Sequence, residues 1–271
     1  MMCDGFEEQT MESKHLVIFL DVLGYKSKVN SDPLQNLEFL NEMKRLVREI
    51  KSISDESQTI YREQIGVRMF SDNFLIFYKW DTNKHPYYEA TFLMSLLENI
   101  CRIQYYFLSK YKLMIRGGIT LGNLYVDEDI VFGKGLIDSY NLENSVATHP
   151  RVVLDEAIFS ELERIVNHNP RTYNLDFVVP IGDDNYRFLN YNRFISPHKP
   201  DRDSIYDESF SELCGKLDYI KEVLTSMIPD YKNEEEESVR KKLGWAIHIH
   251  NEDCELYGLK DYLVEGWDEG Y

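Results

Sequence analysis

Two aspartates occupy positions where the sequence predicts a sharp change of chain direction. Asp21 ends the apolar run HLVIFL, and Asp72 lies in the turn-prone triplet 71–73 between two short apolar segments. A buried strand seldom ends in a carboxylate that has no partner, because burying an unpaired charge is costly. If the two segments lie side by side, the carboxylates converge on a hard-oxygen site suited to Mg²⁺ or Mn²⁺. The alternative is that Asp21 caps the next turn and Asp72 is an ordinary turn residue.

Four further residues could support phosphate or base recognition near such a site. Gly24 lies at an expected strand-to-helix turn, where backbone N–H groups can bind phosphate oxygens. Arg116 precedes a double glycine on a predicted central strand, where it could contact phosphate or form a structural salt bridge. Tyr61 and Arg68 could read the O2 and N3 edge of a pyrimidine ring, or could belong to the core and surface of a strand.

Hydrophobic spacing predicts the elements that position these residues. The expected strands and helices alternate in the order β-α-β-β-α-β and then α-β-α, which is the split βαβ, or ferredoxin-like, α+β arrangement. In that arrangement the first strand lies beside the hairpin and brings Asp21 close to Asp72. The strands are expected at 15–24, 65–70, 74–78, 113–125, 152–154, 173–179 and 186–191, and the helices at 33–53, 86–110, 134–145 and 155–166.

The last quarter of the chain has a different pattern. Apolar residues recur at a three–four spacing from Phe210 to Met227, and 236–250 is a second helical stretch after a linker with two prolines. We expect a flexible tail at 1–13, a main domain at 14–200 and a helical C-terminal extension at 201–271. The extension could cap the sheet of the same domain, or it could serve dimerisation or sensing.

Composition narrows the classes of function. The chain carries 30 Lys+Arg and 47 Asp+Glu, a formal net charge of −17. This balance argues against binding a nucleic acid polymer or a polybasic attachment to membranes, whereas divalent metal can still neutralise the phosphates of a nucleotide. The sequence has no CxxC spacing, no secretory signal and no apolar run that could span a membrane, so we expect a cytoplasmic protein.

Four segments together resemble the class III nucleotidyl cyclases, the adenylate and guanylate cyclase family. FLDVLGY (19–25) is similar to the FxDIxGF motif, and FSDN (70–73) resembles the hairpin with the second metal Asp. IRGGITLG (115–122) is similar to the RxGIxxG strand, and FGKGLIDSYNLEN (132–144) to the WGxxVNxAxRLE segment. The pyrimidine cyclase branch of the antiphage Pycsar systems is similar in its DVLG start, SD hairpin, RGG strand, FGxxLxxAYxLE helix and C-terminal extension.

The resemblance implies a cyclase-homology domain at 14–200 and a homodimer with active sites at its interface. It implies that Asp21 and Asp72 hold two divalent ions, Mn²⁺ or Mg²⁺, with the Val22 carbonyl as a further ligand. The expected reaction converts UTP, or next CTP, to the 3′,5′-cyclic nucleotide and pyrophosphate, and the product activates a separate effector during phage infection. The backbone segment expected to bind the β- and γ-phosphates is Val22, Leu23, Gly24 and Tyr25.

The chain departs from the family at its substrate-reading positions. The ribose-orienting Asn falls on Ile137, the transition-state Arg on Asn141, the base-reading Lys on Arg68 and the second base-reading carboxylate on Ile130. These changes fit a different base preference, with the transition-state cation supplied from elsewhere. They also fit the alternative function, a catalytically inactive cyclase-like dimer that binds a ligand or partner.

Overall fold

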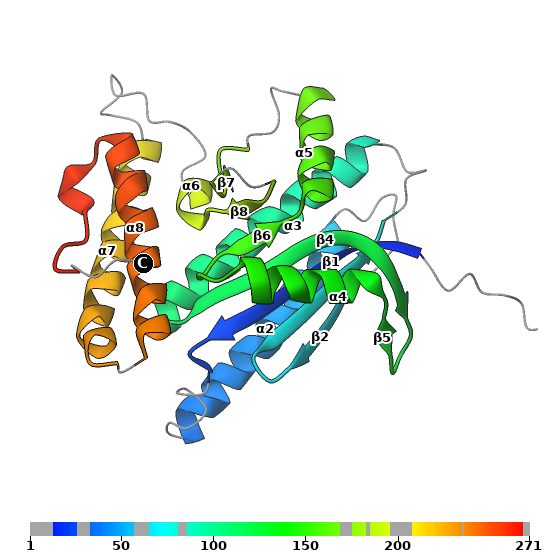
Figure 1. Cartoon of the computed structure of the whole chain (residues 1–271), viewed down its shortest axis with the longest axis horizontal. Helices are drawn as coiled ribbons and strands as arrows, with labels where there is room; N and C mark the ends of the chain where they lie inside the picture. Colours follow the sequence, from blue (N-terminus) through cyan, green and yellow to red (C-terminus); the bar gives the residue numbers. More distant parts are fainter. Residues whose placement is uncertain are drawn as a thin grey trace, which may run out of the picture.

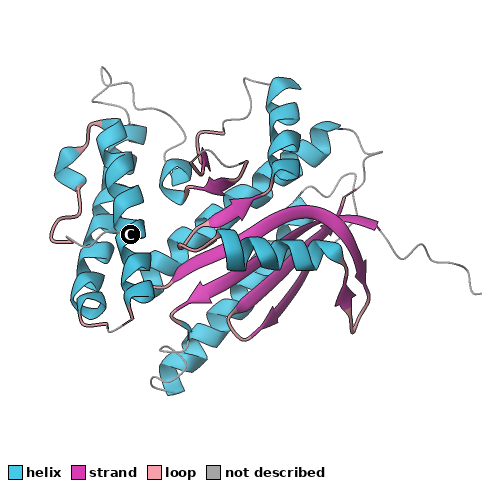
Figure 2. Cartoon of the chain, in the orientation of Figure 1, coloured by secondary structure: helices cyan, strands magenta, loops and turns pink. Residues whose placement is uncertain are grey.

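The computed structural model of the 271-residue chain describes residues 13–25, 33–56, 65–80, 86–168, 175–182, 185–195, 208–234 and 236–267. An 8-stranded sheet with the order β2-β3-β1-β4-β6-β8-β7 lies at its centre, and β5 pairs only with β4 (Figures 1 and 2). The first elements along the chain are β1 (Ser13–Leu23), α2 (Pro33–Glu56), β2 (Gly66–Phe70), β3 (Asn73–Lys79), α3 (Pro86–Tyr106) and β4 (Met114–Val126).

The order β4-β1-β3-β2 with antiparallel neighbours is that of the split βαβ fold, so the predicted α+β class is confirmed. A second group of elements extends the sheet on the far side of β4, and β6 lies parallel to β4. These elements are β5 (Val131–Phe132), α4 (Lys134–Asn141), β6 (Val152–Leu154), α5 (Glu156–His168), β7 (Val178–Pro180), β8 (Arg187–Leu189) and α6 (Tyr191–Ile195).

The two faces of β1 pack against different helices, because side chains alternate along a strand. Leu16, Ile18, Leu20 and Val22 belong to the main core beneath α2 and α3. Val17 and Phe19 point to the opposite face, which α4 crosses (Figure 1). Asp21 has the same parity as Val17 and Phe19, and it therefore lies on the α4 face.

Glycines on β4 allow α4 to lie directly on the sheet. A Cβ atom added to Gly118 would lie 2.3 Å from the Ser139 carbonyl oxygen and 2.5 Å from Leu142 Cβ. At Gly122 it would lie 2.5 Å from the Gly135 Cα. The double-glycine strand thus fixes the position of α4 and of the π-helical turn η2 (Leu142–Val146) that follows it.

The C-terminal residues form a helical pair, α7 (Glu208–Lys232) and α8 (Glu237–Tyr257), followed by the short turn η3 (Lys260–Tyr262). The pair stands beside the sheet in Figure 1. The predicted apolar stripe of α7 is buried, with Leu217, Ile220 and Leu224 each at most 2% exposed. No described helix is both long and apolar enough to cross a membrane.

Some expectations differ from the structure in detail. The segment predicted as one helix at 86–110 forms α3 up to Tyr106 and then the π-helical turn η1 (Phe107–Tyr111). The elements β5 and α6 were not expected, because two and five residues carry too little periodicity to reveal an element. The expected tail, apart from Ser13, and the linker 196–203 lie outside the described residues.

Candidate active site

Asp21 and Asp72 lie at the same end of the sheet. Asp21 pairs with Asn73 on β3 and with Arg116 on β4. Asp72 occupies the turn between β2 and β3, and the Val22 N–H donates a hydrogen bond of 3.0 Å to its carbonyl oxygen. This backbone contact holds the hairpin turn against the end of β1. The predicted proximity of the first strand and the hairpin is therefore confirmed.

The hairpin turn adopts a conformation that few side chains accept. Ser71 has a φ of 57°, in the left-handed region that favours glycine. Only two residues separate the paired Phe70 and Asn73, and such short hairpin turns need a positive φ to match the twist of the strands. The Asn73 side-chain amide donates to Asp72 Oδ1 at 3.2 Å. The Asp72 carboxylate is thus held by its own turn.

Arg116 links Asp21 to a third carboxylate, Glu143. Its Nε lies 3.0 Å from Asp21 Oδ2 and 2.6 Å from Glu143 Oε1. One Nε–H cannot point at both oxygens. It donates to Asp21, and Glu143 Oε1 accepts no hydrogen bond within the described part of the chain. The Glu143 side chain is only 3% exposed.

The position of Glu143 changes its acidity. Burial raises its pKa, the Asp21 carboxylate raises it further, and the Arg116 guanidinium opposes both effects. Sequence reasoning missed Glu143, because a glutamate near the end of a polar helix is typical of a solvated surface. Its place within the segment 132–144 was the available signal.

The oxygen donors at this end of the sheet suit a hard divalent cation. No group of three or more His, Cys, Asp or Glu side chains that could hold a metal occurs among the described residues. Mg²⁺, however, is commonly bound through one or two carboxylates, with substrate phosphates and waters as the other ligands. The Asp21 and Asp72 carboxylates with the Val22 carbonyl fit that chemistry, since all three supply oxygen.

The expected phosphate-binding segment is only partly available. The Val22 N–H is already used by Asp72, and Val22 itself is buried. Leu23 completes β1 opposite Met114. Gly24 is exposed with a φ of 86°, and the ring of Tyr25 packs on Phe39 at 5.8 Å. Phosphate binding by this segment would therefore not use the Val22 N–H.

Of the two proposed base readers, the structure describes only Arg68, and it does not bring Arg68 to the aspartates within one chain. Arg68 donates from Nη2 to the Asp127 carbonyl oxygen at 3.2 Å, and its guanidinium lies 5.9 Å from the ring centre of Phe77. Phe77 pairs with Val17, four residues before Asp21, so Arg68 points toward the other end of the sheet. Tyr61 lies outside the described residues.

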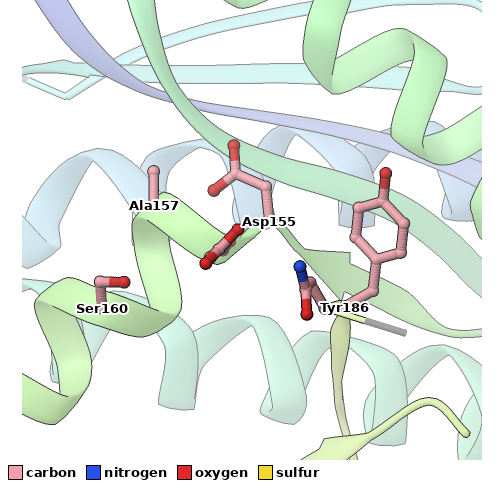
Figure 3. A pocket seen from close by; sticks show the side chains of 6 residues that line it. Asp155, Ala157, Ser160 and Tyr186 are labelled. Atoms are coloured by element: carbon pink, nitrogen blue, oxygen red, sulfur yellow. The ribbon is translucent and has the colours of Figure 1, made fainter. Parts of the chain in front are cut away.

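A cavity of about 760 Å³ lies apart from this site (Figure 3). Asp155 at its wall accepts the Ile158 N–H at 2.9 Å and the Thr120 hydroxyl, so it caps α5. Thr120 pairs with Val17, four residues before Asp21 on β1, so the cavity lies away from the Asp21 end of the sheet. The residues that line it are Asp155, Glu156, Ala157, Ser160, Asn185 and Tyr186.

Comparisons by sequence find no matching protein-family model and no matching curated protein. Comparison with solved structures finds cyclase domains. The monomeric guanylyl cyclase domain of the RhoGC fusion protein from the aquatic fungus Blastocladiella emersonii aligns with a TM-score of 0.46 and 13% identity, over 66% of this chain and 95% of that one. The catalytic core of a rhodopsin-guanylyl cyclase with converted specificity, in complex with ATPαS, gives 0.42 and 12%, over 66% and 96%.

An adenylate/guanylate cyclase/hydrolase from Silicibacter pomeroyi gives a TM-score of 0.37 and 14% identity, over 66% of this chain and 94% of that one. These TM-scores lie below 0.5. The function of this chain is therefore inferred from its own residues.

Proposed function

We propose that this chain is a nucleotidyl cyclase. The observation that carries the proposal is the convergence of Asp21 and Asp72 at the end of neighbouring strands, fixed by the 3.0 Å hydrogen bond from the Val22 N–H to the Asp72 carbonyl oxygen. A half-buried arginine, Arg116, lies 3.0 Å from Asp21. Two carboxylates for cations and a guanidinium for phosphate are the groups that a reaction at a nucleoside triphosphate requires.

The reaction forms one bond and breaks another at the α-phosphorus. The ribose 3′-oxygen attacks the α-phosphorus, its proton leaves to solvent, and the bond to the β-phosphate oxygen breaks to release pyrophosphate. Mn²⁺ or Mg²⁺ at Asp21, Asp72 and the Val22 carbonyl would supply Lewis-acid activation of the hydroxyl and charge neutralisation of the leaving group. Arg116 would contact the phosphates, since it has more donors than its two carboxylate partners use.

We propose a homodimer with the site at the interface. Large apolar side chains are exposed on the α4 face of the sheet and on the β4–β5 hairpin beside it. Phe19 connects two of them, because its ring lies 6.3 Å from Phe70 and 5.5 Å from Tyr140. A patch of this kind marks an interaction surface, and a second copy of the chain is the occupant we propose. Its members are Phe70, Ile130, Phe132, Ile137 and Tyr140, between 47% and 63% exposed.

The substrate we propose is a pyrimidine nucleoside triphosphate, with UTP favoured over CTP. Its support is the resemblance of the sequence to the pyrimidine branch and the loss of the purine-reading residues at Arg68 and Ile130. Arg68 is partly exposed on the α4 face, so it would reach a base bound across the dimer rather than within its own chain. We also propose that the cyclic nucleotide acts as a second messenger in antiphage defence.

The test is incubation of the purified protein with Mn²⁺ or Mg²⁺ and each of the four NTPs, with the products identified by mass spectrometry. We expect one cyclic nucleotide and an equal amount of pyrophosphate. Asp72→Asn should abolish turnover without unfolding the protein. The matched control is Asp155→Asn, away from the Asp21 end of the sheet, where Asn still caps the helix and turnover should persist.

Absence of turnover with every NTP and metal would overturn the enzymatic function. Nucleotide binding without pyrophosphate release would then favour the inactive, ligand-binding dimer. The exposed Ile137 and the exposed Asn141, at the family's Asn and Arg positions, support that second candidate.

A further inference from the structure

Helix α8 covers the sheet end that carries Asp21 and Arg116. Ala246 of α8 lines a narrow crevice together with Met114 and Ile115, the first two residues of β4. Trp245 stacks parallel to His149 at 6.0 Å. Figure 1 shows the first half of α8 beside the start of β4. Helix α8 therefore reaches the start of β4, next to Arg116, within the same chain.

Lys242 lies on the face of α8 that is turned toward this end of the sheet. It precedes Trp245 by three residues and Ala246 by four, and residues at these spacings share one side of a helix. Lys242 is half-buried, whereas the preceding Lys241 is exposed and pairs with Glu237 at 3.0 Å. Lys242 forms no ion pair within 4.0 Å with any residue that the structure describes.

The charges around Lys242 support this placement. Burial lowers its pKa, and the Arg116 guanidinium lowers it further. The carboxylates of Asp21 and Glu236 act in the opposite direction. The charges that shift the Lys242 pKa thus include Arg116 and Asp21 at the sheet end where Ala246, four residues after Lys242, lines the crevice with Met114 and Ile115.

Arg116 lies between Asp21 and Glu143, whereas the half-buried Lys242 has no carboxylate within 4.0 Å among the described residues, so a polyanionic ligand would give its ammonium a partner. We propose that Lys242 completes the nucleotide site from the C-terminal helical pair, where its ammonium binds the substrate triphosphate beside Arg116. This inference rests on the proposed cyclase function. It assigns to α8 a part in substrate binding in addition to packing.

The direct test measures binding of inorganic tripolyphosphate with Mg²⁺ to the full chain, by calorimetry. Losing one hydrogen bond to a charged group costs about 1.5–3 kcal/mol, so Lys242→Met should weaken binding by about 10-fold to 100-fold. Lys242→Arg should restore affinity to within about 3-fold, because it keeps the charge. The matched control, Lys241→Met, should bind as tightly as the wild type.

Equal affinities of Lys242→Met and wild type would overturn the inference, and so would equal losses in Lys242→Met and Lys241→Met. Should Lys242→Met fail to fold, Lys242→Gln with the same unfolding midpoint as wild type takes its place. Where an NTP is turned over, Lys242→Met should raise KM. If the wild type turns over no NTP but binds tripolyphosphate through Lys242, the proposed cyclase activity is wrong and the phosphate-binding site at Lys242 is still supported. If the wild type does not bind tripolyphosphate, the proposed role of Lys242 in phosphate binding is wrong.

Discussion

Two arginine–carboxylate clusters in this chain differ in how completely their polar atoms are used. Asp253 on α8 is 1% exposed, and each of its oxygens accepts a hydrogen bond, one from Arg193 Nε at 2.7 Å and one from Asn190 Nδ2 at 2.9 Å. In the other cluster, Arg116 Nε lies near both Asp21 and Glu143 but donates only to Asp21.

The difference indicates different roles. The Asp253 cluster joins α8 to α6 and to Asn190, the residue between β8 and α6, and a donor meets each Asp253 oxygen, which is typical of a network that fixes one packing arrangement. The Arg116 cluster contains two carboxylates for one arginine, with Lys242 nearby and unpaired among the described residues. Buried polar groups left without partners carry a free-energy cost that an incoming ligand can offset.

The largest expected effect comes from replacing Asp21, which tests the contrast directly. Asp21→Asn should lower turnover by about 10³-fold or more, because several kcal/mol of charge stabilisation are lost. Its free energy of unfolding should change by less than about 1 kcal/mol, since Arg116 keeps Glu143 as its partner. Pyrophosphate release and urea denaturation measure the two quantities.

The control for that comparison is Asp253→Asn, the same chemical change in the other cluster. It leaves the Arg193 guanidinium without its carboxylate and should lower the free energy of unfolding by about 3 kcal/mol. If Asp21→Asn destabilises the protein as much as Asp253→Asn does, the pair of Asp21 with Arg116 is structural, and the contrast between the clusters disappears.

A medium effect is expected from Gly118→Ala, which acts on the position of Glu143. The new Cβ would meet the Ser139 carbonyl oxygen at 2.3 Å, so α4 and η2 must move away from β4. We expect a loss of about 1–3 kcal/mol in the free energy of unfolding, as for other overpacked sites. Turnover should fall as well. Glu143 would move away from Arg116, and the arginine proposed to contact the phosphates would lose one of the two carboxylates beside it.

The matched control is Gly215→Ala on the exposed surface of α7, where an added Cβ has no atom within 4 Å. Alanine is the better helix former, so this variant should gain about 0.5–1 kcal/mol and keep its turnover. Equal behaviour of the two variants in urea denaturation would show that the close approach of α4 to Gly118 is not required.

The sequence predicts the fold where the hydrophobic periodicity is strong. It predicts the part of the site that lies at the end of the first strand and in the hairpin beside it. The long strands β1 and β4 and the turn at Asp72 carry clear alternation and turn residues. Glu143 and Lys242 have no such signal, because their roles come from contacts between distant segments. The pair of Arg116 with Asp21 already spans 95 residues, and Lys242 reaches it from the other side of the linker. In sequence, Lys241 and Lys242 are two equivalent basic residues of one helix.

The smallest expected effect is on the pH dependence of the free energy of unfolding, through His250. His250 on α8 is buried, and its Nε2 lies 2.9 Å from the Tyr262 carbonyl oxygen. Burial lowers its pKa below the usual 6.5, and Lys221 lowers it further, against the hydrogen bond to Tyr262. The unfolded chain therefore takes up this proton first as the pH falls. The stability that neutral His250 contributes is present above about pH 6.5 and is lost as the pH falls through the folded-state pKa.

Urea denaturation between about pH 7.5 and pH 5.5 measures this loss, and His250→Gln should flatten the dependence, because glutamine does not titrate. Glutamine can still donate a hydrogen bond toward the Tyr262 carbonyl oxygen, so the variant should fold at pH 7.5. Tripolyphosphate affinity at pH 7.5 should be the same in wild type and His250→Gln, since His250 contacts Cys254 and Tyr262 and none of the proposed site residues. A variant that loses that affinity while keeping its unfolding midpoint would mean that the packing of α8 around His250 sets the position of Lys242.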